Sequence, residues 1–452
     1  MSIKQGRRGS IFTGLLLIVF GVVFLIDRFD PAFRLGHLIR IYWPVLIILW
    51  GVAKLVDHFL FQQEAGSRAP LLSGSEAALL ILLAFVLSGY AFHDWVQSHF
   101  PSLNVELPPF HQSYTRNHEL PPQAIPTGAH IVLVTHQGDV SVHAAEDNLL
   151  RVHATESAWA PTKPAADEKM QGVHIVTEHD GNTYRVAPVH PEDGGSHIDI
   201  NLDVTVPKTV SVEVDTGHGD IEISGIMGTV VARSGNGDIR TQNLGSGVTV
   251  HLEKGDAKIT GITGNVQLSG RGEDVDLSDI AGDVSLEGAF VGTMRASNIT
   301  RTLRWVSPWG DLTVAQLSGH LEADSGDVEI SGANGPAKLI THNKDIRVTN
   351  VSGRIEIVNT HGDVKVSYLT PPHDDLSVTN DTGDAQVTLP AKSSFRVSAV
   401  SKSGEVRSEF SAPLLNTSNE NDQGQITGQI GTTGPMITIV TSYGTIQLNK
   451  AG

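Results

Sequence analysis

The chain has 452 residues, a formal net charge of −17 and no cysteine. Without cysteine, disulfides, thiolate metal sites and cysteine nucleophiles are excluded. The acidic balance argues against nucleic-acid binding, which requires basic surfaces that displace counterions from phosphates. The composition divides the chain, because the first hundred residues are rich in Leu, Ile, Val and Phe, whereas the rest is rich in Gly, Asp, Thr, Ser and Val.

Three apolar stretches within residues 1–100 predict membrane-spanning helices over about 11–27, 41–61 and 76–94. Each is close to the length of about 17–25 residues that a helix needs to cross a bilayer. A cleaved signal peptide is the alternative for the first stretch. However, no small-residue cleavage site follows it, and two further apolar stretches do. We therefore expect a helical anchor that contacts membrane lipid.

The lysine and arginine residues that flank these stretches indicate the orientation of the anchor. Lys4, Arg7 and Arg8 precede the first stretch, and three arginines lie in the connection that follows it. The balance slightly favours a cytoplasmic N-terminus, which after three spans places the larger part of the chain outside the cytoplasm. Two spans instead of three would leave that part in the cytoplasm.

The first two apolar stretches share a pattern with a known membrane region. A glycine-containing helix ends in aromatic and acidic residues, and the next helix begins with Trp-Pro. The segments read GLLLIVFGVVFLIDRF and WPVLIILWGVAKL, within residues 10–60. This pattern resembles the LiaI/LiaF-like transmembrane region of bacterial envelope proteins. The resemblance implies a multi-pass protein of a bacterial cell membrane, and it makes regulation of an envelope-stress response one candidate function.

Prolines recur through residues 101–127 and forbid long regular elements there. A proline-rich segment of this kind favours an extended spacer, so we expect it to separate the anchor from the domain that follows. In that domain we expect a β-rich part over 128–215, a regular repeat over 216–368, and closing strands with a cap over 369–452.

From residue 221 onward, apolar residues recur every nine positions, and the interval changes only near residues 294 and 328. A second, mostly apolar residue follows two positions later, and the residue between is mainly polar. This alternation is the pattern of a strand with one buried face. A glycine two positions before the first buried residue supplies a tight corner in most units. Because no unit could bury its face alone, the repeat predicts a stacked solenoid.

The residue directly before the first buried position shows that a coil contains two units. In every second unit it is nearly always aspartate, whereas in the intervening units it varies. We therefore expect an all-β solenoid with two short strands per coil of about 18 residues and with aspartates stacked along one edge. These aspartates are Asp220, Asp238, Asp256, Asp274, Asp311, Asp327, Asp345 and Asp363.

Two interpretations of this aspartate column are open. Stacked carboxylates with a period of nine could bind a row of Ca²⁺ ions, as in repeat-in-toxin proteins. The GGxGxD motif of those proteins is absent, however. An aspartate that accepts N–H groups at a tight corner explains the Gly-Asp pairs without a metal. We favour this second interpretation and predict no resident metal or cofactor.

Two tryptophans lie where the period shifts, in the segment WVSPWGDL. Trp305 falls on a buried phase of the repeat and is expected in the core. Trp309 is expected nearer the surface, where it could contact a sugar ring or a partner.

No arrangement of residues points to catalysis. Neither GxSxG nor HExxH nor a phosphate-binding loop occurs in a suitable context. A glycan-active β-helix enzyme, the weakest alternative, would need carboxylates that converge in a groove, whereas these aspartates are spaced along corners.

Four segments carry a second resemblance, to the bacterial "putative adhesin" strand-repeat family. They read INLDVTVPKTVSVEVDTGHGDIEISGIMGTV (200–230), SGDVEISGANGPAKL (325–339), FRVSAVSKSGEVRSEF (395–410) and MITIVTSYGTIQL (436–448). The resemblance implies a β-solenoid with a surface role and no catalytic residues. We therefore expect a non-enzymatic, membrane-anchored envelope protein that presents an adhesin-like β-solenoid for contact with a protein or a glycan.

Overall fold

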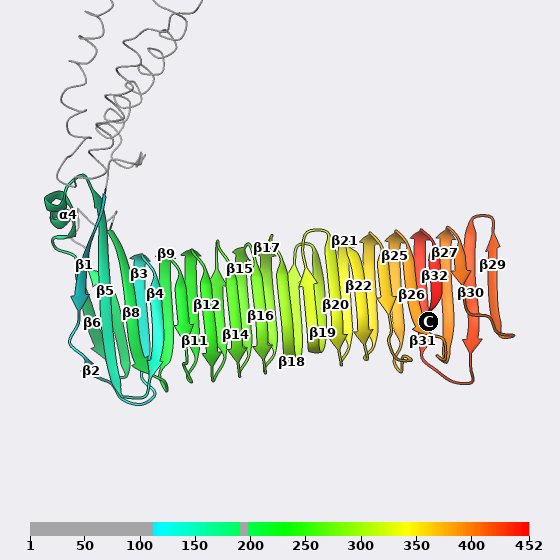
Figure 1. Cartoon of the computed structure of the whole chain (residues 1–452), viewed down its shortest axis with the longest axis horizontal. Helices are drawn as coiled ribbons and strands as arrows, with labels where there is room; N and C mark the ends of the chain where they lie inside the picture. Colours follow the sequence, from blue (N-terminus) through cyan, green and yellow to red (C-terminus); the bar gives the residue numbers. More distant parts are fainter. Residues whose placement is uncertain (1–111, 190–197, 452) are drawn as a thin grey trace, which may run out of the picture. The chain divides into compact units, whose positions relative to one another are not determined.

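The structure, a computed structural model, describes residues 112–189 and 198–451. Most of these residues lie in strands, and they form one compact unit that begins at Ser113. The strands lie side by side along one axis and form a long solenoid (Figure 1). The nearly all-β architecture expected from the repeat is therefore confirmed for the described residues.

The predicted membrane anchor, residues 1–100, lies outside the described residues. Part of the predicted spacer is described, and it forms the strand β1 (Gln112–Glu119), which pairs with β5 (Leu149–Ala160). Regular structure therefore begins within the predicted spacer, because residues 112–119 contain no proline and can join a sheet. Within the described ranges, the one helix is α4 (Lys163–Met170), and no helix is long and apolar enough to span a membrane.

The regular coils have the predicted repeat of 18 residues. Each strand pairs in parallel with the strand two places further along the chain, so that Ile221 lies beside Ile239 and Val230 beside Val248. The two strands of a coil therefore belong to two facing rows. The strands of this region are β9 (Ser211–His218), β10 (Ile221–Ser224), β11 (Val230–Asn236), β12 (Ile239–Leu244), β13 (Val248–Leu252), β14 (Ala257–Ile262), β15 (Val266–Gly272), β16 (Val275–Ile280) and β17 (Val284–Phe290).

The two corners of a coil use glycine for different reasons. At the corner that carries the aspartates, Gly237 has a φ of 144°, and a Cβ there would lie 2.2 Å from the carbonyl oxygen of Gly219. At the other corner, Gly282 lies outside the left-handed region, but a Cβ there would lie 2.2 Å from the carbonyl oxygen of Gly264. The first corner thus requires both the conformation and the close approach that glycine permits, and the second requires the close approach alone.

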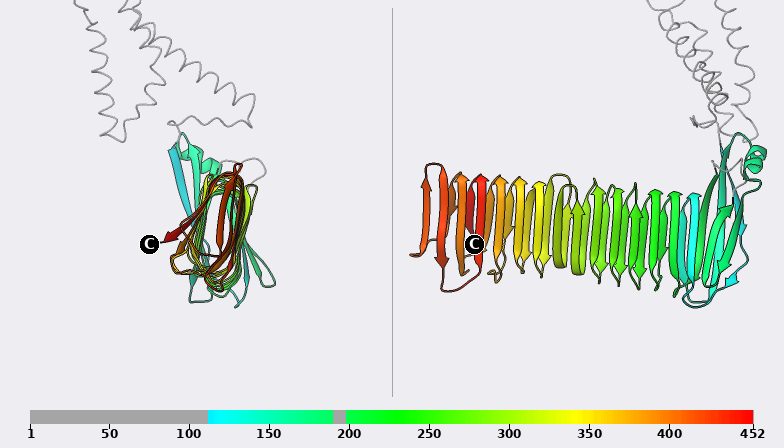
Figure 2. Two further views of the ribbon diagram at one scale, coloured as in Figure 1. Left: turned by 90° about the vertical axis from the view of Figure 1, so that its right-hand side faces the viewer. Right: turned by 180° about the vertical axis from the view of Figure 1, so that it is seen from behind.

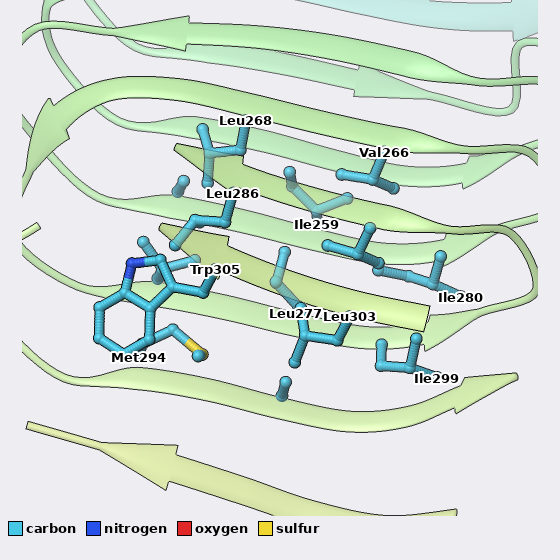
Figure 3. Packing of buried hydrophobic residues seen from close by; sticks show 14 of the residues in the cluster. Ile259, Val266, Leu268, Leu277, Ile280, Leu286, Met294, Ile299, Leu303 and Trp305 are labelled. Carbon is cyan, nitrogen blue, oxygen red and sulfur yellow. The ribbon is translucent and has the colours of Figure 1, made fainter. Parts of the chain in front are cut away.

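Buried side chains from the two rows fill the interior of the solenoid (Figure 3). Leu268, Leu286 and Trp305 are direct neighbours in one row, and Ile259 and Leu277 are neighbours in the other. Each of these residues is at most 7% exposed. Burying one such aliphatic side chain contributes about 1.5–3 kcal/mol. The core exists only because coils stack, as in other repeat folds.

One coil runs in the opposite direction. β18 (Met294–Ser307) completes a coil in the usual direction, and the chain then turns back into β19 (Gly310–Ala323). β19 is antiparallel to β18 in both rows, with Met294 beside Ala323 and Leu303 beside Val314. β19 is also antiparallel to the two strands that follow it, β20 and β21, after which parallel winding resumes. We refer to β19 as the reversed coil.

The reversed coil corrects the predicted uninterrupted winding. Leu312 and Leu321 fall on the predicted buried phase and are 3% and 0% exposed. The nine-residue period located them correctly, because an in-and-out pattern reads the same in either chain direction. For the same reason the period could not show that the strand runs backwards.

Parallel coils continue beyond the reversed coil. Val328 lies beside Ile346, and Ala337 lies beside Ile355. The strands of this region are β20 (Asp327–Ala333), β21 (Ala337–Asn343), β22 (Asp345–Val351), β23 (Ile355–His361), β24 (Val364–Ser367), β25 (Leu376–Thr382) and β26 (Ala385–Pro390).

Near the C-terminal end, one coil is inserted between two others. Ile437 of β31 pairs with Leu376 on one side and with Val397 on the other. Figures 1 and 2 show these red strands between strands coloured orange. The strands of this end are β27 (Phe395–Ser403), β28 (Val406–Ser408), β29 (Leu415–Glu420), β30 (Gln423–Ile430), β31 (Met436–Tyr443) and β32 (Ile446–Ala451).

The other end repeats this arrangement. Ile131 of β3 pairs with Tyr184 on one side and with Val212 on the other. The order of coils along the axis therefore differs from their order in the chain at both ends. The remaining strands of this end are β2 (Gln123–Ala124), β3 (His130–Gln137), β4 (Val140–Ala145), β6 (His174–Asp180), β7 (Thr183–Val189) and β8 (Ile198–Pro207).

Candidate functional site

Most of the predicted aspartates form a hydrogen-bonded ladder along one edge of the solenoid. In each rung, an aspartate Oδ1 accepts the backbone N–H of the corresponding residue in the next coil. The rungs with their N–O distances are Asp139 to Asp220 (2.9 Å), Asp220 to Asp238 (2.8 Å), Asp238 to Asp256 (3.0 Å), Asp256 to Asp274 (2.9 Å), Asp274 to Thr293 (2.7 Å), Asp345 to Asp363 (2.7 Å), Asp363 to Asp384 (2.9 Å) and Asp384 to Thr445 (2.7 Å). The ladder ties neighbouring coils together at their corners.

The ladder gives these aspartates a structural role. Part of their remaining charge faces arginine, since Arg240 lies 2.7 Å from the outer oxygen of Asp238 and 3.5 Å from that of Asp220. The accepted N–H belongs to the next coil, whereas the sequence led us to expect a bond within one turn. Among the described residues, no group of three or more His, Asp or Glu side chains is placed to hold a metal ion.

Asp311 is not a member of the column, which corrects the sequence-based assignment. It precedes a buried leucine, as the others do, but it lies in the reversed coil. There its backbone pairs with Val306 and Ile340. These two residues belong to the strand row that faces the one in which the other column aspartates lie. The carboxylate of Asp311 lies 3.7 Å from Arg304, so it takes part in a surface ion pair.

Asp327 also makes no rung, because it follows a hairpin. Its own N–H donates to Asp324 Oδ1 (2.8 Å), and the N–H of Asp345 in the next coil donates to the carbonyl oxygen of Gly326 (2.9 Å). The ladder is therefore interrupted beside the reversed coil.

The edge of the solenoid opens where the ladder is interrupted. In a regular coil this edge is closed by a crossover, such as residues 291–293, that joins one strand row to the other. Beside the reversed coil, two hairpins stand in its place, at 307–310 and 324–327. Each hairpin joins strands of the same row. Because neither passes from row to row, interior side chains border a cavity at this edge.

The cavity has a volume of about 200 Å³ and an apolar floor. Phe290, Trp305 and Leu312 line it, and all three are buried. At its mouth Val291 is 63% exposed and Trp309 is 41% exposed. An apolar cavity with an exposed aromatic residue beside it is typical of a binding site.

One polar group of the cavity has no protein partner. Trp305 is only 7% exposed, and none of the described residues accepts a hydrogen bond from its Nε1. Buried donors in folded proteins are nearly always paired, and an unpaired one costs about 1–3 kcal/mol. The unpaired indole N–H is therefore a destabilising feature of the core beside this cavity.

The hairpin on the rim of the cavity is held by its own polar groups. The amine of Lys344 donates to the backbone oxygen of Asp324. Burial lowers the pKa of this amine, although the carboxylates of Asp324 and Asp327 oppose the shift. The N–H groups of Asp327 and Gly326 each lie 2.8 Å from Asp324 Oδ1 and hold the pKa of that carboxyl below its ordinary value.

Both tryptophans singled out from the sequence border this cavity. Trp305 lies in the core and Trp309 at the surface, as expected. The sequence did not indicate that they share one cavity, because that depends on the reversal of β19. The signals that could have shown it are the turn-forming segments SPWG (307–310) and DSGD (324–327), the second of which coincides with the shortened interval.

The coil architecture and the family models together define the class of protein. The Toastrack DUF4097 model matches residues 129–299 and 264–449, which together span most of the chain. The chain therefore belongs to the Toastrack DUF4097 family. The model of the LiaI-LiaF-like transmembrane region matches residues 11–55, which confirms the resemblance seen in the first two apolar stretches. No curated protein matches the chain.

Three solved structures illustrate the similarity to known proteins. A "putative cell adhesion protein" from Clostridium sporogenes is 9% identical, with 75% of this chain and 100% of that chain covered and a TM-score of 0.18. A "putative adhesin" from Bacteroides fragilis is 9% identical, with 75% and 97% covered and a TM-score of 0.24. A "putative adhesin" from Parabacteroides distasonis is 11% identical, with 74% and 97% covered and a TM-score of 0.22. At these TM-scores the assignment rests on the family model.

Proposed function

We propose that the protein is a membrane-anchored, non-enzymatic envelope protein whose solenoid binds a protein or a glycan at its open edge. The proposal rests on one observation: the solenoid departs from its regular winding at the reversed coil, and an apolar cavity with the exposed Trp309 on its rim lies there. Such a cavity lowers stability, which favours a role in binding. The transmembrane-region match over residues 11–55 supports the anchor.

Site-specific photocrosslinking in intact cells tests this proposal. Trp309 is replaced by the photoreactive p-benzoylphenylalanine, and Trp159, which is 45% exposed on β5, is replaced in the same way as the matched control. We expect a discrete adduct from position 309 and none from position 159. Equal labelling at both positions, or none at either, would contradict binding at the open edge.

We further propose that the anchor is multi-pass and that the solenoid lies outside the cytoplasm of a bacterial cell. The charge balance around the three predicted spans supports this orientation. Protease added to intact cells should digest the solenoid. Protection in intact cells together with protection in spheroplasts would place the solenoid in the cytoplasm.

Regulation of an envelope-stress response is a second candidate, and the LiaI-LiaF-like match favours it. In that case the membrane region itself would carry the signal. Deletion of residues 1–100 should then abolish the transcriptional response to envelope stress, whereas Trp309→Ala should leave the response intact. The reverse pattern would favour ligand binding by the solenoid as the main function.

A further inference from the structure

We propose that β29 is an association site, at which two copies of this chain pair edge to edge as antiparallel strands about a two-fold axis at Thr417. Figure 1 shows β29 beyond β30, as the last strand at the C-terminal end of the solenoid. The site is separate from the open edge beside the reversed coil, so pairing here does not require binding there.

One edge of β29 is free. β29 pairs with β30 on one side, and no other described strand pairs with it. Five of its six residues are exposed, and the sixth is partly buried. A free edge of this kind presents a row of backbone N–H and C=O groups to which a further strand can bond.

The neighbouring strand row is closed at this end, in contrast to β29. Its last strand is β28, and the side chain of Asn419 bonds to the outer edge of that strand. Oδ1 of Asn419 accepts the N–H of Val406 (2.8 Å), and Nδ2 donates to the carbonyl oxygen of Val406 (3.0 Å). The amide thus takes the place of a further strand, and it also fixes β29 beside β28.

The turn that joins β29 to β30 makes the free edge rigid. Asn421 and Asp422 have φ angles of 49° and 61°, and two consecutive residues with positive φ are typical of a type I′ hairpin turn. A strand that is already extended and held in place loses little conformational entropy when a partner pairs with it. The edge is therefore preformed for association.

β29 lacks the features that usually prevent a free edge from pairing. In other proteins charged side chains and prolines on the edge strand have this effect. At the opposite end of the solenoid, the outer strands carry such charges, Arg116 and Glu119 in β1 and Glu178 and Asp180 in β6. β29 has no proline and a single charged residue, Glu420, at its end.

The backbone of β29 places Thr417 at the centre of the free edge. In an antiparallel pair, residues that exchange both backbone bonds alternate with residues that exchange none. The N–H of Gln429 donates to the carbonyl oxygen of Leu414 (3.2 Å), and the two strands continue in this register. The even-numbered residues therefore bond towards β30. The odd-numbered residues of β29 face the free edge, with Thr417 in the middle.

The side chains of β29 make this edge complementary to itself. An antiparallel pair centred on Thr417 places Thr417 beside its own counterpart and Asn416 beside Ser418, and such polar pairs stabilise neighbouring strands. Glu420 then lies opposite the uncharged Leu414. A symmetric parallel pair would instead place the two Glu420 carboxylates side by side, where like charges destabilise pairing. The partner that fits is therefore a second copy in the antiparallel direction.

The proposed pair closes at two copies, because a two-fold axis uses each edge once. Six residues form a short interface, so we expect a transient association. Membrane anchoring of both copies, which the match over residues 11–55 supports, would raise their effective concentration.

Disulfide trapping in the full-length protein tests the association. Because the chain has no cysteine, a single introduced cysteine reports a single contact. Thr417→Cys should form a disulfide-linked dimer on mild oxidation in detergent micelles. Glu420→Cys is the matched control from the same strand, since its counterpart would lie six residues along the strand, about 20 Å away. We expect at least fivefold more dimer from position 417, and equal yields or no dimer at 417 would overturn the association.

Charge substitutions on the axis test the register. Copies with Asn416→Cys are mixed with differently tagged copies that carry Ser418→Cys, because these positions lie opposite each other in the proposed pair. Thr417→Lys in both copies places like charges together and should lower the yield of the mixed dimer at least threefold. Thr417→Lys in one copy and Thr417→Glu in the other should restore it. An unchanged yield with two lysines, or no recovery with opposite charges, would overturn the proposed register.

The experiments at positions 309 and 417 report on different parts of the solenoid. Trapping at 417 without a photocrosslinked adduct at 309 would support the association and contradict binding at the open edge. An adduct at 309 without trapping at 417 would leave binding at the open edge intact and overturn the association through β29.

Discussion

The regular coils and the reversed coil follow the same in-and-out pattern of residues, yet they close the edge of the solenoid differently. In a regular coil, a glycine corner crosses between the strand rows, and an aspartate bonds it to the next coil. In the reversed coil, hairpins keep the chain within one row, the ladder stops, and the core borders a cavity. The strands therefore form the core of this fold, whereas the crossovers close its edge.

The largest expected difference in stability is between a Gly→Ala substitution in a regular corner and one in a hairpin beside the reversed coil. Gly237→Ala would place Cβ 2.2 Å from a backbone oxygen at a φ of 144°, so we expect a loss of about 3 kcal/mol or more in the free energy of unfolding. Gly326→Ala, in the second hairpin, meets no atom closer than 3.9 Å and should cost less than about 1 kcal/mol. Urea denaturation followed by fluorescence measures both. Equal losses would show that the hairpin is as constrained as the regular corner.

A smaller difference is expected between two buried leucines. Leu286 is fully buried in a regular coil. Leu286→Ala should therefore lower the free energy of unfolding by about 3 kcal/mol or more, since a new cavity forms. Leu312 already borders a cavity, so Leu312→Ala should cost about 1–2 kcal/mol. Equal losses, measured by the same denaturation experiment, would mean that the edge is closed in solution.

The aspartate ladder should contribute less per residue. Asp256→Ala leaves the N–H of Asp274 without its acceptor, which should cost about 1–2 kcal/mol. Asp256→Asn keeps an Oδ1 acceptor and should cost about half as much or less. Asp327→Ala removes no rung and serves as the control from the interrupted part. If Asp256→Ala and Asp327→Ala were equally stable, the ladder would have no energetic role.

The smallest expected effect is a pH dependence confined to the second hairpin. The pKa of Asp324 is lowered in the folded protein by the N–H groups of Asp327 and Gly326. Because the pKa is lowered, the ionised carboxylate stabilises the folded protein at pH values above the ordinary pKa of 3.8. This stabilisation is lost as the pH falls through the pKa of the folded protein. Hydrogen exchange of these two amides, corrected for the intrinsic rate, should therefore accelerate below about pH 4. In Asp324→Asn this acceleration should be absent.

The period and the aspartates were sufficient to predict the strand positions, the buried residues and the coil of 18 residues. They succeed because burial acts on each strand locally and repeats without change. The reversal at β19 was not predictable from the same pattern, because Leu312 and Leu321 alternate with polar neighbours in either direction. The cavity follows from that reversal, so its location was equally hidden, although Trp305 and Trp309 stood out as unusual residues.

The inserted coil of β31 and β32 has a consequence for the order of folding. Residues 395–408 cannot join the coil of β25 and β26 until residues 436–451 are available, since those later strands lie between them. Folding of this end therefore cannot proceed coil by coil as the chain emerges during synthesis. It requires contacts distant in sequence, which form slowly because a long loop must close first. A chain that stops short of β31 would leave two unpaired strand faces, and such edges are prone to aggregation and degradation.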